Sequence, residues 1–178
     1  MMILSDQLRY PIGSFEPNTS ASSDSRQQLI RQISGISAAL RLLVRNLTFE
    51  QLQVPYRQGG WCIQQIIHHM ADNDMNAYLR LKRALTEEQP KASSYREDLF
   101  AELNDYSDAS IELSIALLEA LHNRLVIVLK SLSEDQFQRT LQTGLLGIIT
   151  IDIAVQRFEW HNRHHMAQIQ SLIERMGW

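Results

Sequence analysis

The sequence contains a single cysteine, Cys62, and few residues that interrupt helices. One cysteine excludes an intramolecular disulfide and is typical of a reducing compartment. Only seven glycines and four prolines occur among 178 residues, and long segments are rich in Leu, Ile, Ala, Gln, Glu and Arg, which favours helix. We therefore expect one domain, residues 1–178, that is long enough to bury a hydrophobic core.

Strong charge and long apolar runs are also missing. The formal net charge is −3 and the pI is about 6.1, so no basic excess indicates a nucleic-acid partner. No segment approaches the ~18 consecutive apolar residues of a membrane span. Residues 1–13 lack the basic start and apolar core of a signal peptide. These absences predict a cytoplasmic protein that binds neither nucleic acid nor membrane.

Apolar residues recur with helical spacing in four long segments. The pattern predicts helices over about 22–46, 62–88, 108–132 and 150–178. Residues 1–21 contain two prolines and a glycine, and we expect them to form an extended arm. Four amphipathic helices with irregular connections predict an all-α four-helix bundle.

The connections carry recognisable signals of their own. Thr48 and Ser133 each precede a glutamine by three residues, which is typical of a capping box. A short helix is expected around residues 95–104. A β-branched segment with two glycines predicts a small hairpin within residues 140–149.

The last predicted helix carries two histidines on its apolar side. His165 falls in the middle of the apolar stripe and His161 at its edge, whereas His164 points away with Trp160. Two imidazoles at i, i+4 can reach one metal ion. A single inward histidine is more often a hydrogen-bonded core residue, but this pair favours a metal site.

An internal repeat indicates the third ligand. The sequence HHMA at residues 68–71 recurs at residues 164–167, which pairs His69 with the inward His165. His69 also begins a polar line along the second predicted helix, and we select it as the third ligand. His122, alone on its own apolar stripe, is the competitor and is kept as a candidate pocket residue.

Three neutral imidazoles leave open coordination positions on a divalent metal. Zinc, nickel, copper and cobalt all accept imidazole, so the ligand set does not choose among them. An open position can hold water or a thiolate substrate. The polar line continues through Asn73, Asn76 and Arg80, which would suit a solvated helix flank or, together with His122, the binding of a small polar or anionic substrate.

Ordered motifs extend over nearly the whole chain. They are YPIG (10–13), YRxGGW (56–61), HHxADxxxNxYxRxK (68–82), LTEExP (85–90), LHxR (121–124), WHxxHHxAxI (160–169) and RMGW (175–178). In these motifs the chain resembles the YfiT-like family of the DinB-like superfamily. The resemblance implies a four-helix bundle with about one zinc or nickel ion per chain on His69, His161 and His165. It also implies a cytoplasmic homodimer, for which Trp160, Ile153 and His164 are candidate interface residues.

The resemblance implies two activities, and a third reading is not enzymatic. A thiol S-transferase of the bacillithiol type would bind a low-molecular-weight thiol as thiolate and hold it against an electrophile. A metal-dependent hydrolase would use a metal-bound water and usually a nearby base, but the sequence has no His-Glu-x-x-His motif, and Glu159 is predicted to point away from the stripe. We therefore favour the transferase, with the hydrolase as the alternative and a non-catalytic metal-binding bundle as the second alternative.

Overall fold

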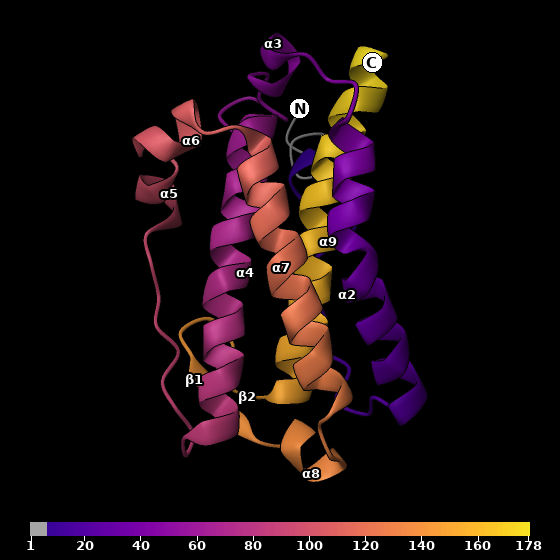
Figure 1. Cartoon of the computed structure of the whole chain (residues 1–178), viewed down its shortest axis with the longest axis vertical. Helices are drawn as coiled ribbons and strands as arrows, with labels where there is room; N and C mark the ends of the chain where they lie inside the picture. Colours follow the sequence, from indigo (N-terminus) through magenta and orange to yellow (C-terminus); the bar gives the residue numbers. More distant parts are fainter. Residues whose placement is uncertain (1–6) are drawn as a thin grey trace.

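The structure, a computed structural model, describes residues 7–178. Four long helices lie along its longest axis (Figure 1) and agree with the sequence prediction to within three residues at every end. They are α2 (Ser23–Val44), α4 (Ile63–Thr86), α7 (Ile111–Lys130) and α9 (Ile151–Met176). The four-helix bundle is confirmed.

The helices follow an uncommon order of directions. The chain after α4 runs back along the outside of that helix before α7 begins, so α4 and α7 point the same way, as do α2 and α9 (Figure 1). Helix α2 packs against α7 and α9, and α4 packs against the same two helices. Helix α4 therefore lies beside α9, which places the two halves of the histidine repeat on neighbouring helices.

Short elements cap the ends of the bundle. Helices α3 (Phe49–Leu52) and α8 (Glu134–Phe137) both begin at the expected capping boxes. The hairpin consists of β1 (Thr140–Thr143) and β2 (Gly147–Thr150), paired antiparallel. It therefore matches the segment predicted from the sequence, and its last residue caps α9.

Two short helices replace the single one expected around residues 95–104. These are α5 (Glu97–Phe100) and α6 (Asn104–Asp108). The second brings the buried Tyr106 against α4, where its hydroxyl donates a hydrogen bond of 2.7 Å to Asp72. The chain therefore turns between the two helices to anchor the long connection on the bundle.

Buried polar residues divide the hydrophobic core. One apolar cluster includes Phe137 and Ile149 near the hairpin, and the other includes Leu52 near α3. Buried polar residues separate the members of the two clusters along each long helix: Ser37 on α2, Asp74 on α4, His122 on α7, and several on α9, including Asn162. Since such a layer must pair its polar groups across helices, it favours one register of the bundle over others.

The N-terminal arm lies along α9. The amide of Asn18 donates to Gln156 Oε1 and the Gln156 side chain donates back to the Asn18 carbonyl, both at 2.9 Å. Residues 10–22 are irregular, as expected, but residues 7–9 form a helical turn, and residues 1–6 lie outside the described part of the chain.

The arm corrects one prediction about α9. Tyr10 packs on His164, and Phe15 packs on Trp160. His164 is buried, and Ile153 is partly buried against the core. The arm therefore covers His164 and Trp160, and the core covers part of Ile153, on the side of α9 expected to be an outward dimer face, because periodicity gives the direction of a side chain and not what covers it.

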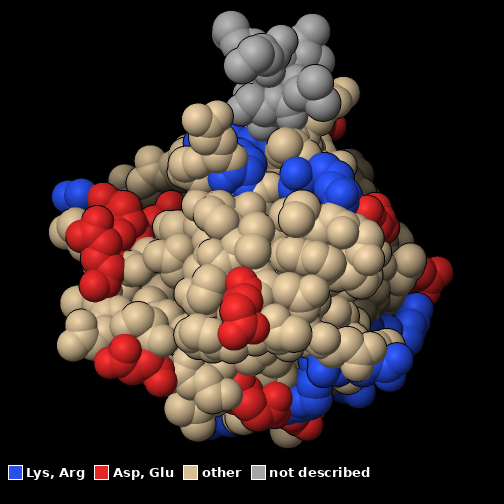
Figure 2. All heavy atoms as spheres, turned by 90° about the horizontal axis from the view of Figure 1, so that it is seen from above, with Lys and Arg blue, Asp and Glu red and all other residues tan. Residues whose placement is uncertain are grey.

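The surface carries mixed charge where the molecule is viewed from above. Figure 2 shows Lys and Arg as well as Asp and Glu mostly toward the edge of this face, with an acidic group near the centre among uncharged residues. Within residues 7–178, no helix combines the length and the apolar character needed to cross a bilayer.

Candidate metal centre

Three histidines converge between α4 and α9. His161 Nε2 lies 3.3 Å from His69 Nε2 and 3.2 Å from His165 Nε2, and the three candidate ligand nitrogens all lie within 4.8 Å of one another. The i, i+4 spacing on α9 brings two of the rings together, and the adjacent α4 supplies the third. The structure thus brings together the three residues selected from the sequence.

Burial keeps the three imidazoles neutral. It lowers the pKa of His69 to about 4 and the pKa values of His161 and His165 well below the ordinary range, with neighbouring histidines adding to the effect. Neutral imidazole is the form that binds a metal ion. At neutral pH the cluster therefore needs to release no proton from an imidazolium before it can bind a metal.

Gln168 fixes which nitrogen of His165 is free. The His165 Nδ1–H donates to Gln168 Oε1 at 2.9 Å, which leaves the lone pair on Nε2, facing the cluster. The Gln168 amide in turn donates to the Arg9 carbonyl and to His164 Nε2, at 2.9 and 3.0 Å. The arm and His164 thus hold the group that orients His165.

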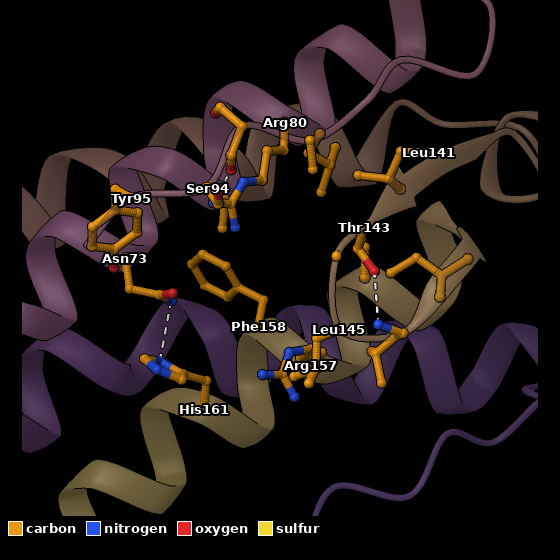
Figure 3. A pocket seen from close by; sticks show the side chains of 18 of the residues that line it. Asn73, Arg80, Ser94, Tyr95, Leu141, Thr143, Leu145, Arg157, Phe158 and His161 are labelled. Atoms are coloured by element: carbon orange, nitrogen blue, oxygen red, sulfur yellow. Dashed lines mark hydrogen bonds between the residues drawn. The ribbon is translucent and has the colours of Figure 1, made fainter. Parts of the chain in front are cut away.

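Asn73 makes the corresponding contact to His161. Its side-chain amide lies 3.1 Å from His161 Nδ1 (Figure 3). If Nε2 binds a metal, Nδ1 carries the proton and needs an acceptor, which Asn73 Oδ1 would provide with the amide turned over, at the expense of the 3.3 Å bond that Asn73 donates to Asp74 in this structure. Asn73 is therefore a partner of a candidate ligand as well as a lining residue of the adjacent cavity.

The donor set fits a divalent metal. A tetrahedral ion with metal–nitrogen distances of about 2.0–2.1 Å holds its nitrogens about 3.3 Å apart, close to the two separations in the cluster. His69 Nδ1 is buried and has no hydrogen-bond partner among the described residues, so this third ring is held by packing against Trp61, at 4.6 Å between ring centroids. Three protein ligands would leave a fourth position open.

Behind Asn73 lies the polar layer of the core. Asp74 accepts hydrogen bonds from His122 at 2.7 Å, from Asn162 at 2.9 and 3.0 Å, and from Asn73 at 3.3 Å. Burial raises the pKa of Asp74, and the bonds from His122 and Asn162 oppose that shift. This arrangement gives Asp74 a structural role that the sequence did not reveal: it ties α4, α7 and α9 together beside the histidine cluster.

A cavity of about 470 Å³ opens beside His161. It is lined by α4, α9, the hairpin and residues 92–97, and Figure 3 shows its side chains around the hollow. Of the four residues expected to bind substrate, Asn73 and Arg80 line this cavity.

The other two substrate candidates lie elsewhere. The Asn76 side chain donates to the Asp72 carbonyl at 2.8 Å, one turn back on its own helix. His122 is 1 % exposed and is bonded to Asp74 in the core. Neither lines the cavity, so we correct their assignment: the polar line twists around α4, and only part of it faces this space.

Sequence reasoning missed two residues at this site. Gln168 lies three positions after His165, and Arg157 lies four positions before His161, so helical spacing alone could have drawn attention to both. Helical spacing excluded His164 as a ligand and the repeat excluded His68, and the structure places neither in the cluster: His68 bonds to Ser114 at 2.7 Å, and His164 stacks on Trp160.

Replacing Gln168 with leucine should weaken metal binding. The substitution removes the acceptor that holds the proton on His165 Nδ1, and loss of such a partner typically costs 10–100-fold in metal affinity. Competition with a chelating dye measures the effect. Gln170→Leu is the matched control, since Gln170 is exposed two residues further on and bonds only to Glu174 among the described residues. Equal affinities in the two variants would contradict the assigned role of Gln168.

Comparisons with known proteins agree with this fold. Residues 32–169 match the family model of the DinB superfamily. The chain, a four-helix bundle with a histidine cluster between two helices, therefore belongs to the DinB superfamily, and within it to the YfiT-like proteins.

The particular relatives are bacterial. A Bacillus subtilis protein named "Putative metal-dependent hydrolase YfiT" is 40% identical over 172 residues, which cover 96% of this chain and 97% of that protein. A Geobacillus kaustophilus protein, also named as a "Putative metal-dependent hydrolase", is 39% identical over 97% of this chain and 98% of its own. The solved structure of Bacillus subtilis YfiT, described as having an unusual four-helix bundle topology, superposes with a TM-score of 0.94 at 40% identity, covering 97% of this chain and 99% of that one. The relatives and the three-histidine cluster together support a metal-dependent enzyme.

Proposed function

We propose that His69, His161 and His165 bind one divalent metal ion and present its open position to the adjacent cavity. The observation that carries this proposal is the position of His161, which belongs to the histidine cluster and also lines the cavity. A closed structural site usually has a fourth protein ligand, whereas the histidine, cysteine and acidic side chains of the described residues supply only three here. The arrangement suits an ion that meets a substrate.

The reaction we favour is transfer of a low-molecular-weight thiol of the bacillithiol type to an electrophile. A metal in this site would lower the pKa of a thiol that reaches its open position. The sulfur would bond to the electrophilic carbon, the leaving group would depart with its electron pair, and the thiol proton would pass to solvent. The protein would orient the reactants through Asn73 and Arg80 and shield them with the apolar cavity wall.

The scarcity of acidic groups in the cavity supports this choice. Among the described residues that line it, Glu97 alone carries a carboxylate, and this residue is exposed. Glu159, the other carboxylate weighed as a base, bonds to Arg163 and lies outside the cavity. A thiol bound as thiolate needs no general base near the metal, whereas water attack usually does.

Metal-dependent hydrolysis is the second candidate. It is favoured by the names of the relatives, which describe metal-dependent hydrolases. In that case a water at the open position would attack an ester or amide, and Glu97 would be the group to test as a base.

Zinc suits the near-tetrahedral spacing, with nickel as the alternative. A homodimer in the cytoplasm remains our prediction for the assembled protein.

Two parallel assays on the metal-loaded protein distinguish the reactions. One follows the loss of free thiol in the presence of a bimane electrophile, and the other follows the hydrolysis of a panel of esters and amides. We expect thiol conjugation above the uncatalysed rate that disappears when a chelator removes the metal. Metal-dependent hydrolysis with no thiol conjugation would instead support the second candidate, and neither activity across both panels would contradict an enzymatic role.

A further inference from the structure

Two arginines line the cavity from different helices. Arg80 is on α4 and Arg157 is on α9, and both belong to the cavity wall together with His161. Figure 3 shows Arg80 and Arg157 on opposite sides of the hollow. Two guanidinium groups that line one small cavity repel each other, and burying each charge costs free energy. Such an arrangement is therefore unusual unless an anion binds between them.

No acidic side chain among the described residues forms an ion pair with either arginine. Arg80 donates to the Ser93 carbonyl, while its buried Nε has no hydrogen-bond partner in the described chain. The Arg157 guanidinium lies over the rings of Phe15 and Trp160, 5.7 and 5.8 Å from their centroids. Both groups therefore retain hydrogen-bonding capacity for a ligand.

The side chains that line the cavity carry a net positive charge. Burial lowers the pKa of both arginines, and the charge of Arg80 lowers that of Arg157 further. Arginine nevertheless stays charged in proteins. Against these two cations the lining offers one carboxylate, Glu97, which acts on Arg157 through its field and not through an ion pair. With His161 neutral, an anion entering the cavity meets a net positive charge.

The rest of the wall is mostly apolar. Leucine, isoleucine and phenylalanine side chains come from the hairpin and from α9: Leu141, Leu145, Leu146, Ile149 and Phe158. Tyr95 also lines the cavity, and its hydroxyl is buried with no hydrogen-bond partner among the described residues. A volume of about 470 Å³ is in the usual range for sites that bind small molecules.

We infer that the cavity binds an amphipathic small molecule whose carboxylate or phosphate lies between Arg80 and Arg157. Its apolar part packs against the hairpin, and its reacting part lies toward His161. The inference rests on the proposed function for the reaction that follows, but anion binding itself requires no metal. It adds Arg157 to the site and specifies a charged end and an apolar body for one substrate.

The test uses the full-length chain freed of metal with a chelator. Its result therefore does not depend on whether the proposed metal site is correct. Isothermal titration calorimetry measures binding of octanoate, octyl phosphate and the neutral octanol to the wild type, Arg80→Gln and Arg157→Gln. We expect either anion to bind more tightly than octanol, and each substitution to raise the Kd of that anion about 10-fold or more. The anion that binds more tightly identifies the chemical group.

Control variants make the result specific. Arg124→Gln removes the same charge from an exposed position outside the cavity and should leave the Kd unchanged. Arg157→Lys keeps the charge and should bind better than Arg157→Gln. The inference is overturned if neither anion binds the wild type, if octanol binds equally well, or if all four arginine variants behave alike, with circular dichroism confirming that each is folded.

Discussion

Asp74→Ala should lower the free energy of unfolding by about 3–5 kcal/mol. The carboxylate is completely buried and accepts hydrogen bonds from His122, Asn162 and Asn73. Alanine would leave the His122 and Asn162 donors without this acceptor inside the core, where water cannot replace the lost bonds. This loss is a large fraction of the about 5–15 kcal/mol that stabilises a typical protein.

Urea denaturation of the metal-free protein measures this effect. Asp98→Ala is the control, because Asp98 is exposed and pairs only with Arg96 among the described residues, so its removal should lower the free energy of unfolding far less. Asp74→Asn keeps one acceptor oxygen and should fall between the two. If Asp74→Ala were no more harmful than Asp98→Ala, the polar layer would not contribute to stability as described.

His161→Ala should abolish metal-dependent activity while the bundle stays folded. His161 is the member of the cluster that also lines the cavity, and its Nε2 lies near both other rings. Removing a direct ligand should weaken metal binding by more than the about 10–100-fold typical of losing a hydrogen-bond partner. The fold should survive, because alanine favours helix and the two apolar clusters are untouched.

Activity, metal affinity and circular dichroism should be recorded together for this variant. The control is His68→Ala, which removes another buried imidazole of the same bundle, one that bonds to Ser114 outside the cluster. This control should keep both metal and activity. Full activity in His161→Ala would exclude His161 from the mechanism, and a collapsed helical spectrum would show that the residue is structural.

Local patterns predicted the helices and the meeting of the three histidines. The 3.6-residue period places His161 and His165 on one face, and the repeat of HHMA selects His69 over His68. The capping residues Thr48 and Ser133 could also be predicted from the sequence, because a capping box needs only groups within four residues of one another.

Contacts between distant segments could not be predicted in this way. Asp74 lies 48 residues from His122 and 88 from Asn162, and nothing local marks them as partners. The cavity is formed jointly by the hairpin, residues 92–97, α4 and α9, which are distant in sequence. The sequence therefore could not predict that Arg80 and Arg157 line the same cavity. Likewise, the arm that covers His164 is distant in sequence.

The most direct test of the account is the metal content of the purified protein, measured by elemental analysis. Wild type and His68→Ala should each hold about one divalent metal ion per chain, whereas His69→Ala and His165→Ala should hold almost none. Equal metal content in all four proteins, or no metal in the wild type after growth with zinc and nickel, would contradict the three-histidine centre and the enzyme built on it.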